Sequence, residues 1–115
     1  MKKFLALFTC AENSKNHEKW KKLSTLEQKD RTSRGFEAQE KWNQKYKGQI
    51  ISESGDLGKV ISVNKSGGQS IPSKMGKFMV VQAESLDEAA SMFLDHPHFA
   101  IFPGDGVEII EYLNS

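Results

Sequence analysis

The chain has 115 residues, with 16 Lys and Arg against 15 Asp and Glu, and a formal net charge of +1. This length fits one domain with one core, residues 1–115, and the near-neutral charge excludes a bulk field that would favour nucleic acid or anionic lipid. A single cysteine, Cys10, excludes an internal disulfide and indicates a reducing compartment. No apolar run approaches the roughly 18 residues of a transmembrane helix, and the run from Phe4 to Phe8 is too short for a signal peptide. We therefore expect a cytoplasmic protein without a membrane or nucleic-acid partner.

Charge is unevenly distributed along the chain. Lys and Arg are frequent in residues 15–47 and absent from residues 84–115. This pattern is more typical of solvated surfaces than of a binding patch.

The first predicted element is a strand over residues 4–10, followed by a polar, helix-prone stretch up to residue 47. The strand is apolar on both alternating faces, which predicts that it is covered on both sides. Ser14 is placed to cap a short helix that carries Trp20. Ser24 and Glu27 have the spacing of a capping box and predict the start of a second helix.

The middle of the chain predicts two strand segments, a loop and a longer strand. Residues 49–53 and 58–64 indicate strands on either side of a glycine-containing turn. Residues 65–73 are rich in Gly and Ser and predict a flexible loop. Residues 77–84 predict a strand that is apolar on both faces.

The clearest helix signal begins at Ser85, which is followed by Glu88 at the capping-box position. Apolar residues then recur at helical spacing, and Pro97 is predicted to end the helix. The stripe comprises Leu86, Ala89, Ala90, Phe93 and Leu94. Residues 103–106 predict a turn into a last strand over residues 107–113.

The predicted order is strand, helix, strand, strand, helix, strand. Two interleaved right-handed β-α-β crossings give a ferredoxin-like α+β fold, with an antiparallel sheet and helices on one face. The uncovered face would be too apolar for water, which predicts a homodimer through it. The residues assigned to that face are Leu5, Leu7, Phe8, Met79, Val81 and Ile110.

Three segments resemble the YCII-related, or DGPF-type, domains. They are Gly76-Lys-Phe-Met-Val-Val-Gln-Ala-Glu-Ser-Leu-Asp-Glu-Ala-Ala, the helix end Asp95-His-Pro, and Gly106-Val-Glu-Ile-Ile. The resemblance implies a dimeric α/β barrel of ferredoxin-like subunits and a cleft with a His-containing site. The family's Asp-Gly-Pro-Phe segment is replaced here by Ser70-Ile-Pro-Ser-Lys-Met.

His96 is the main candidate for chemistry, because histidine gains or loses a proton near neutral pH. Asp56 is the candidate to orient it. The simpler alternative is that His96 caps the end of a helix. A metal site is disfavoured, since His96 and His98 have only a distant His17 as a third nitrogen ligand. We expect His98 to face solvent.

Cofactor motifs are absent from the sequence. The segment Gly55-Asp-Leu-Gly58-Lys59 lacks the spacing of a phosphate-binding loop, and Cys10 has no electropositive neighbour in sequence that would make it a nucleophile. We therefore expect neither cofactor nor metal.

Two functional hypotheses follow. The first is a small enzyme that uses His96 for proton transfer, of isomerase or lyase type, on an apolar or aromatic molecule in a cleft at the sheet–helix boundary. The alternative is a non-catalytic ligand-binding or regulatory dimer module. A purely structural dimer is the third possibility.

Overall fold

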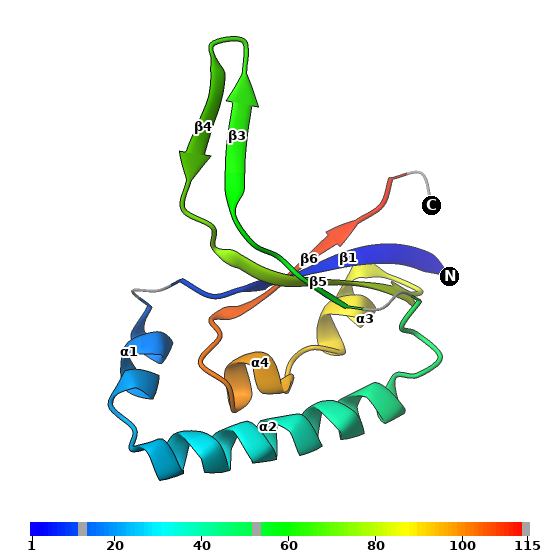
Figure 1. Ribbon diagram of the computed structural model, residues 1–115. Coiled ribbons are helices and arrows are strands. Elements are labelled where there is room, and N and C mark those ends of the chain that lie inside the picture. Colours follow the sequence, from blue (N-terminus) through cyan, green and yellow to red (C-terminus); the bar gives the residue numbers. More distant parts are fainter. Residues whose placement is uncertain (12–13, 52–53, 114–115) are drawn as a thin grey trace.

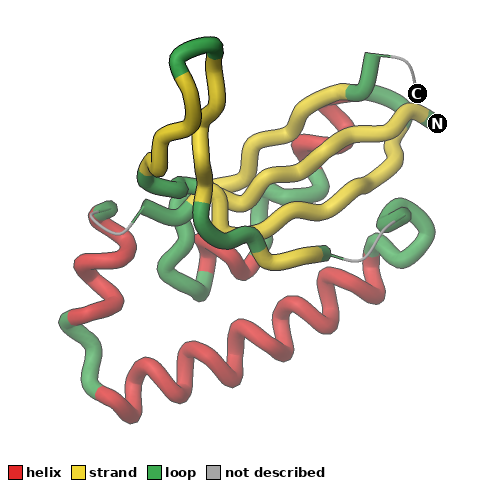
Figure 2. The backbone as a smooth tube through the Cα atoms, turned by 45° about the horizontal axis from the view of Figure 1, so that its top comes forward, coloured by secondary structure: helices red, strands yellow, loops and turns green. Residues whose placement is uncertain are grey.

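A computed structural model describes residues 1–11, 14–51 and 54–113 of the chain (Figures 1 and 2). Helices and strands follow one another in ten segments. They are β1 (Lys2–Thr9), α1 (Lys15–Lys21), α2 (Thr25–Lys45), β2 (Gly55–Asp56), β3 (Val60–Asn64), β4 (Gly67–Ile71), β5 (Met75–Ala83), α3 (Leu86–Ser91), α4 (Pro97–Ala100) and β6 (Gly106–Glu111).

Four strands form an antiparallel sheet in the order β2-β5-β1-β6. Apart from the separate β3–β4 hairpin, this is the order in which two β-α-β units interleave. The ferredoxin-like α+β prediction is confirmed. The two longest strands, β1 and β5, occupy the centre of the sheet, and both are rich in apolar residues, as is typical of strands buried within a sheet.

The core lies between this sheet and the helices. β1 directs Phe4, Ala6 and Phe8 into it, and the cross-strand partners of Phe4 and Ala6 on β5 are Val81 and Met79. Our assignment of Phe8, Met79 and Val81 to the uncovered face is therefore wrong. Both faces of these strands are apolar, so the alternation alone does not say which face the helices cover.

The opposite side of the sheet carries no helix, and we call it the open face. Figure 1 shows α2, α3 and α4 on one side of the sheet only. Register places two cross-strand pairs on the open face, Leu5 with Val80 and Leu7 with Phe78, and Ile110 lies beside Leu5. Of the residues predicted for this face, Leu5, Leu7 and Ile110 are correctly assigned.

The three predicted helix starts agree with the structure, whereas the helix end predicted at Pro97 does not. Ser14, Ser24 and Ser85 each accept a backbone hydrogen bond as N-caps, and Ser24 with Glu27 completes a capping box. α3 ends at Ser91, however, and Pro97 begins α4 instead of ending a helix. Proline suits a first helical position because its missing N–H would be unpaired there anyway.

The largest departure from prediction is at residues 65–73, which were predicted to be a loop. The structure pairs β3 with β4 in a hairpin, which we call the arm, joined by a turn at Lys65 and Ser66. Gly67 has φ +119°, a conformation that favours glycine. The arm stands away from the sheet on the side opposite α2 (Figure 1).

Candidate active site

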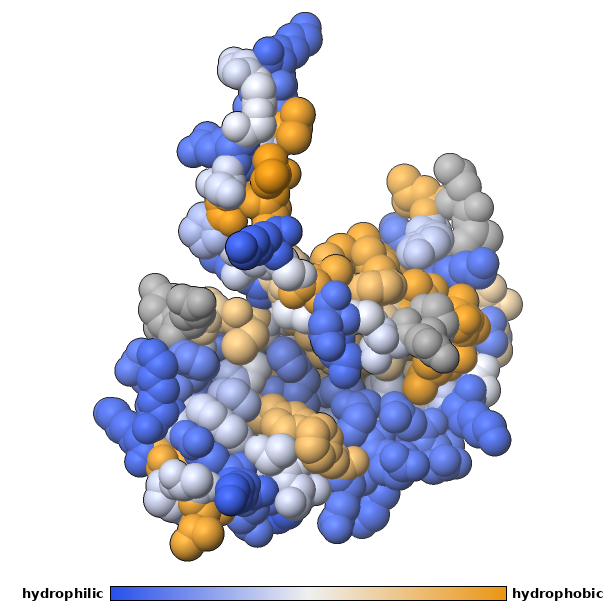
Figure 3. All heavy atoms as spheres, viewed as in Figure 1, coloured by the Kyte–Doolittle hydropathy of each residue, from blue (hydrophilic) through white to orange (hydrophobic). Residues whose placement is uncertain are grey.

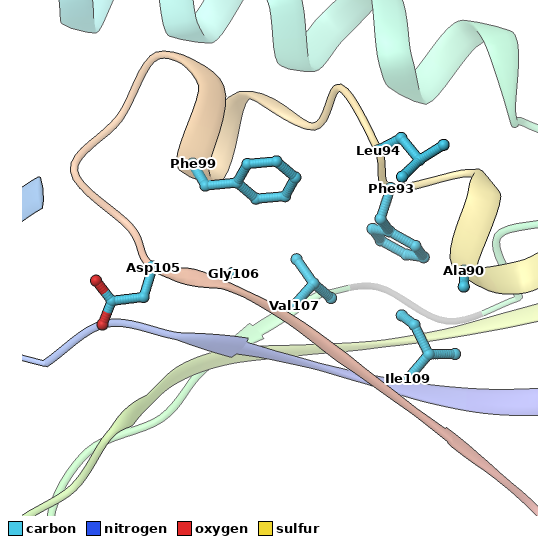
Figure 4. A pocket seen from close by; sticks show the side chains of 8 residues that line it. All are labelled: Ala90, Phe93, Leu94, Phe99, Asp105, Gly106, Val107 and Ile109. Atoms are coloured by element: carbon cyan, nitrogen blue, oxygen red, sulfur yellow. The ribbon is translucent and has the colours of Figure 1, made fainter.

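A cavity of about 360 Å³ lies between β6 and the segment that contains α3 and α4 (Figure 4). Val107 and Ile109 of β6 form one wall, and the phenyl rings of Phe93 and Phe99 form the facing wall. An apolar cavity that ends in a few polar groups is the usual form of a small-molecule site. The α3–α4 segment creates this space because it breaks at residues 92–96 and does not continue as one helix.

Asp105 marks the polar end of the cavity. Its carboxylate turns toward the end of β1 and accepts a hydrogen bond of 2.9 Å from the backbone N–H of Ala11 (Figure 4). Its own N–H donates to the carbonyl oxygen of Thr9 at 2.9 Å. The tight turn before β6 therefore fixes a negative charge beside an apolar space.

His98 lies next to Asp105 because both bind the same carbonyl. The His98 Nε2 atom is 2.8 Å from the carbonyl oxygen of Thr9. A carbonyl oxygen only accepts, so Nε2 carries the hydrogen, and Nδ1 is the basic nitrogen. Among the described residues, no group hydrogen-bonds to Nδ1.

Packing holds the His98 ring in place. The ring meets the Phe8 ring edge-on, with centroids 5.2 Å apart. A Cβ atom at Gly104 would fall within 3.0 Å of three His98 ring atoms, so only glycine leaves room for the ring. Burial lowers the pKa of His98, while its bond to Thr9 and the Asp105 charge act in the opposite direction.

His96 has a different environment, with only 2% of its surface exposed. The rings of Phe8, Trp42 and Phe93 surround it at centroid distances of 5.0, 4.8 and 5.7 Å. Burial, with smaller contributions from the charges of His98 and Lys77, lowers its pKa to about 3. His96 is therefore neutral at physiological pH.

The neutral form of His96 has one defined tautomer. Its Nδ1 accepts a hydrogen bond of 3.0 Å from the backbone N–H of His98, as the N-cap of α4, so Nε2 carries the hydrogen. This Nε2 is buried and has no hydrogen-bond partner among the described residues. An unpaired buried donor of this kind costs stability and is common at functional sites. His96 thus caps the start of α4, whereas we had considered it as a cap for a helix end.

The structure does not join Asp56 to His96. Asp56 is exposed on β2, opposite Lys77 of β5, and its carboxylate makes no hydrogen bond or ion pair with the described residues. Lys77 in turn lies opposite Phe8, with its Nζ 5.8 Å from the Phe8 ring centroid. Lys77 therefore lies between Asp56 and Phe8, and Asp56 has no direct contact with His96.

His98 and Asp105 are the residues that sequence reasoning missed. We expected His98 to face solvent, but it is half-buried. No local pattern predicts the carbonyl of Thr9 as their common partner, since Thr9 is 89 residues away from His98. The one available signal was the density of polar and glycine residues between Asp95 and Gly106.

Cys10 and the three histidines do not gather in one place within the described residues. No group of three or more His, Cys, Asp or Glu side chains suited to a metal occurs in residues 1–11, 14–51 and 54–113. The Cys10 Sγ lies 3.9 Å from the Pro103 carbonyl oxygen, and burial, followed by the charge of Asp105, raises the pKa of its thiol. Cys10 is thus a poor nucleophile.

Comparison with known proteins gives a likeness of fold. No family model and no curated protein matches the chain. No described helix has the length and apolar character needed to cross a bilayer. A similar solved structure is that of 5-chloro-2-hydroxyhydroquinone dehydrochlorinase (TftG) from Burkholderia phenoliruptrix AC1100, in complex with 2,5-dihydroxybenzoquinone. It matches with a TM-score of 0.54 and 16% identity, over 98% of this chain and 95% of that one, so the two proteins share a fold.

Proposed function

We propose that this protein is an enzyme that transfers a proton on a small, flat, apolar or aromatic molecule bound in the cavity beside β6. The observation that carries the proposal is the apolar cavity that ends at Asp105, with His98 bound to the same Thr9 carbonyl. The fold-sharing enzyme from Burkholderia is consistent with it, since loss of hydrogen chloride includes removal of a proton. The reaction is of isomerase or lyase type.

His98 is the proposed proton acceptor. Its tautomer is fixed by Thr9, its Nδ1 lone pair is unpaired, and Asp105 stabilises the charge it gains. His96, which we first expected to carry the proton, is better suited to donate a hydrogen bond from its neutral Nε2–H. A ligand oxygen that reached this donor would remove the cost of leaving it unpaired.

Binding is tested first, with 2,5-dihydroxybenzoquinone as the probe in a ¹H–¹⁵N NMR titration. We expect shifts at the amides of Phe99, Val107 and Ile109. Ala90→Trp fills the cavity and should weaken binding at least about tenfold. Ala100→Trp is the control, because Ala100 is exposed on α4 and does not line the cavity. Equal effects of the two variants would contradict the cavity as the binding site.

Catalysis is tested with His98→Gln on ligands found in this way. Loss of a general base lowers turnover by about 10²–10⁴-fold, with binding retained. His96→Gln should weaken binding more than it changes the pH dependence of the rate. If every bound ligand is recovered chemically unaltered, the protein is the non-catalytic binding module instead.

We further infer that the chain is YCII-related, located in the cytoplasm, and a homodimer through the open face. The quoted C-terminal segments and the shared fold support the family, and the lone cysteine supports the location. Leu5, Leu7, Phe78 and Val80 lie side by side on the open face and support the dimer. Sedimentation at micromolar concentration should give a dimer that Leu7→Lys dissociates. Leu26→Lys, a change at an exposed leucine of α2, should not.

A further inference from the structure

We propose that the arm is a clasp, which seats its apolar side on the β6 flank of a second copy of this chain. The proposal rests on the proposed dimer and adds to it a second contact surface and a defined symmetry axis.

The rest of the chain covers very little of the arm. It is a two-stranded hairpin of five residues in each strand, and every residue except Val60 is exposed. Ile61 and Val63 are 66% and 75% exposed on one of its faces, and Ile71 is 43% exposed at its base. An isolated two-stranded hairpin is marginally stable in water, so an ordered arm with apolar side chains needs a cover.

The arm and the open face both carry apolar side chains, and they lie on the same side of the sheet. Figure 3 shows hydrophobic atoms along the side of the arm that turns toward the body, and again on the exposed side of the sheet. Figure 1 shows the arm rising from that same side, away from the helices. A partner seated on the open face therefore meets the arm as well.

The arm is long enough to reach past such a partner. Five residues at ~3.3 Å each extend it by about 16 Å, whereas stacked sheets lie about 10 Å apart. The middle of the arm, with Ile61 and Val63, is then level with the edge of the partner's sheet. The tip, with Lys65, lies beyond that edge.

The distribution of charge favours contact between the arm and the β6 edge of the partner's sheet. The arm contains one charged residue, Lys65 at its turn, and Lys59 lies just before it, whereas residues 84–115 contain seven Asp and Glu and no Lys or Arg. This acidic segment includes β6, whose Glu108 lies on the open face opposite Leu7. Lys65 at the tip of the arm and Lys59 at its base thus suit the acidic β6 flank of the partner.

This choice fixes the symmetry of the dimer. A twofold axis parallel to the strands stacks the β2 edge of one sheet, next to the arm, over the β6 edge of the other. An axis across the strands would instead stack the two β2 edges on each other, which places each arm at the partner's β2 edge and away from β6. The geometry points to the first arrangement, in which each copy clasps the other.

The test compares dimer dissociation constants by sedimentation. Ile61→Ser with Val63→Ser should raise the constant by at least about tenfold, because two apolar side chains lose their cover. Leu26→Ser on α2 is the matched control for an exposed apolar residue and should leave it unchanged. Lys65→Glu should weaken the dimer, most strongly at low salt, whereas Lys29→Glu on α2 should not.

Hydrogen exchange gives an independent readout. Arm amides should be protected at concentrations where the dimer forms and should exchange quickly on dilution. A wild-type monomer would overturn both the dimer and the clasp. A stable dimer that the arm variants leave unchanged, with unprotected arm amides, would overturn the clasp alone.

Discussion

Two histidines separated by one proline have different environments. His96 is surrounded by aromatic side chains and is neutral, whereas His98 is half-buried and its Nε2 lies 2.8 Å from the Thr9 carbonyl oxygen. The sequence identifies the pair as chemically interesting, because His96 and His98 are two of the three histidines in the chain and are separated by one residue. It does not identify which histidine is the more deeply buried, since contacts from β1 and α2 decide that.

The buried His96 predicts a specific dependence of stability on pH. Its pKa is about 3 in the folded chain and about 6.5 when unfolded, so between these values the unfolded chain binds more protons. The free energy of unfolding should fall by about 1 kcal/mol per pH unit as pH drops from 6.5 toward 3. His98 adds to this in the same direction, because its pKa is also lowered.

Urea unfolding of His96→Asn measured across this pH range should show a shallower slope, since Asn keeps an N-cap acceptor and does not titrate. Trp42→Phe is the control, because it disturbs the same aromatic cluster and leaves both histidines in place. A slope that is unchanged in His96→Asn would contradict a buried neutral His96.

We predict that Gly104 maintains the His98 tautomer in which Nε2 carries the hydrogen. Gly104→Ala should push the ring away from Thr9 and cost about 1–3 kcal/mol, because the Nε2–H loses its acceptor. Imidazole ¹⁵N shifts should report the mixed tautomers that follow. Gly48→Ala, where an added Cβ meets nothing within 4 Å, should leave the shifts as they are. A wild-type tautomer pattern in Gly104→Ala would argue against this role.

At the scale of helices and strands, the sequence patterns that predicted the structure correctly are those between residues within one helical turn of each other. All three serine N-caps are confirmed, because a cap bonds to N–H groups three residues ahead. Signals that need a distant partner are not reliable. Leu94 fits the apolar stripe yet is 71% exposed, since α3 ends before reaching it.

The capping box of α2 gives the element-scale prediction. Ser24→Ala should lower the free energy of unfolding by about 1 kcal/mol, because the N–H of Glu27 loses its acceptor. Ser33→Ala in the exposed middle of α2 should be neutral or slightly stabilising, since alanine is the better helix former. Chemical denaturation measures both, and equal effects would show that the cap contributes nothing.

At the scale of the whole molecule, one sheet face is covered by helices and the other faces water. A second copy on the open face would make folding and association one equilibrium. The melting temperature should then rise by about 3 °C for each tenfold increase in protein concentration. Leu7→Lys should remove this dependence, as calorimetry over a hundredfold concentration range can show. A melting temperature independent of concentration in the wild type would mean that the chain folds alone.

The sequence by itself determined the ferredoxin-like fold class, the starts of α1, α2 and α3 and the apolar character of both sheet faces. These depend on alternation and on caps, which act between residues close in the chain. Only the tertiary structure decided which face the helices cover, that Pro97 starts a helix, that residues 67–71 form a strand, and that His98 and Asp105 meet at Thr9. Each of these depends on contacts between segments far apart in sequence, and local patterns carry no information about such contacts.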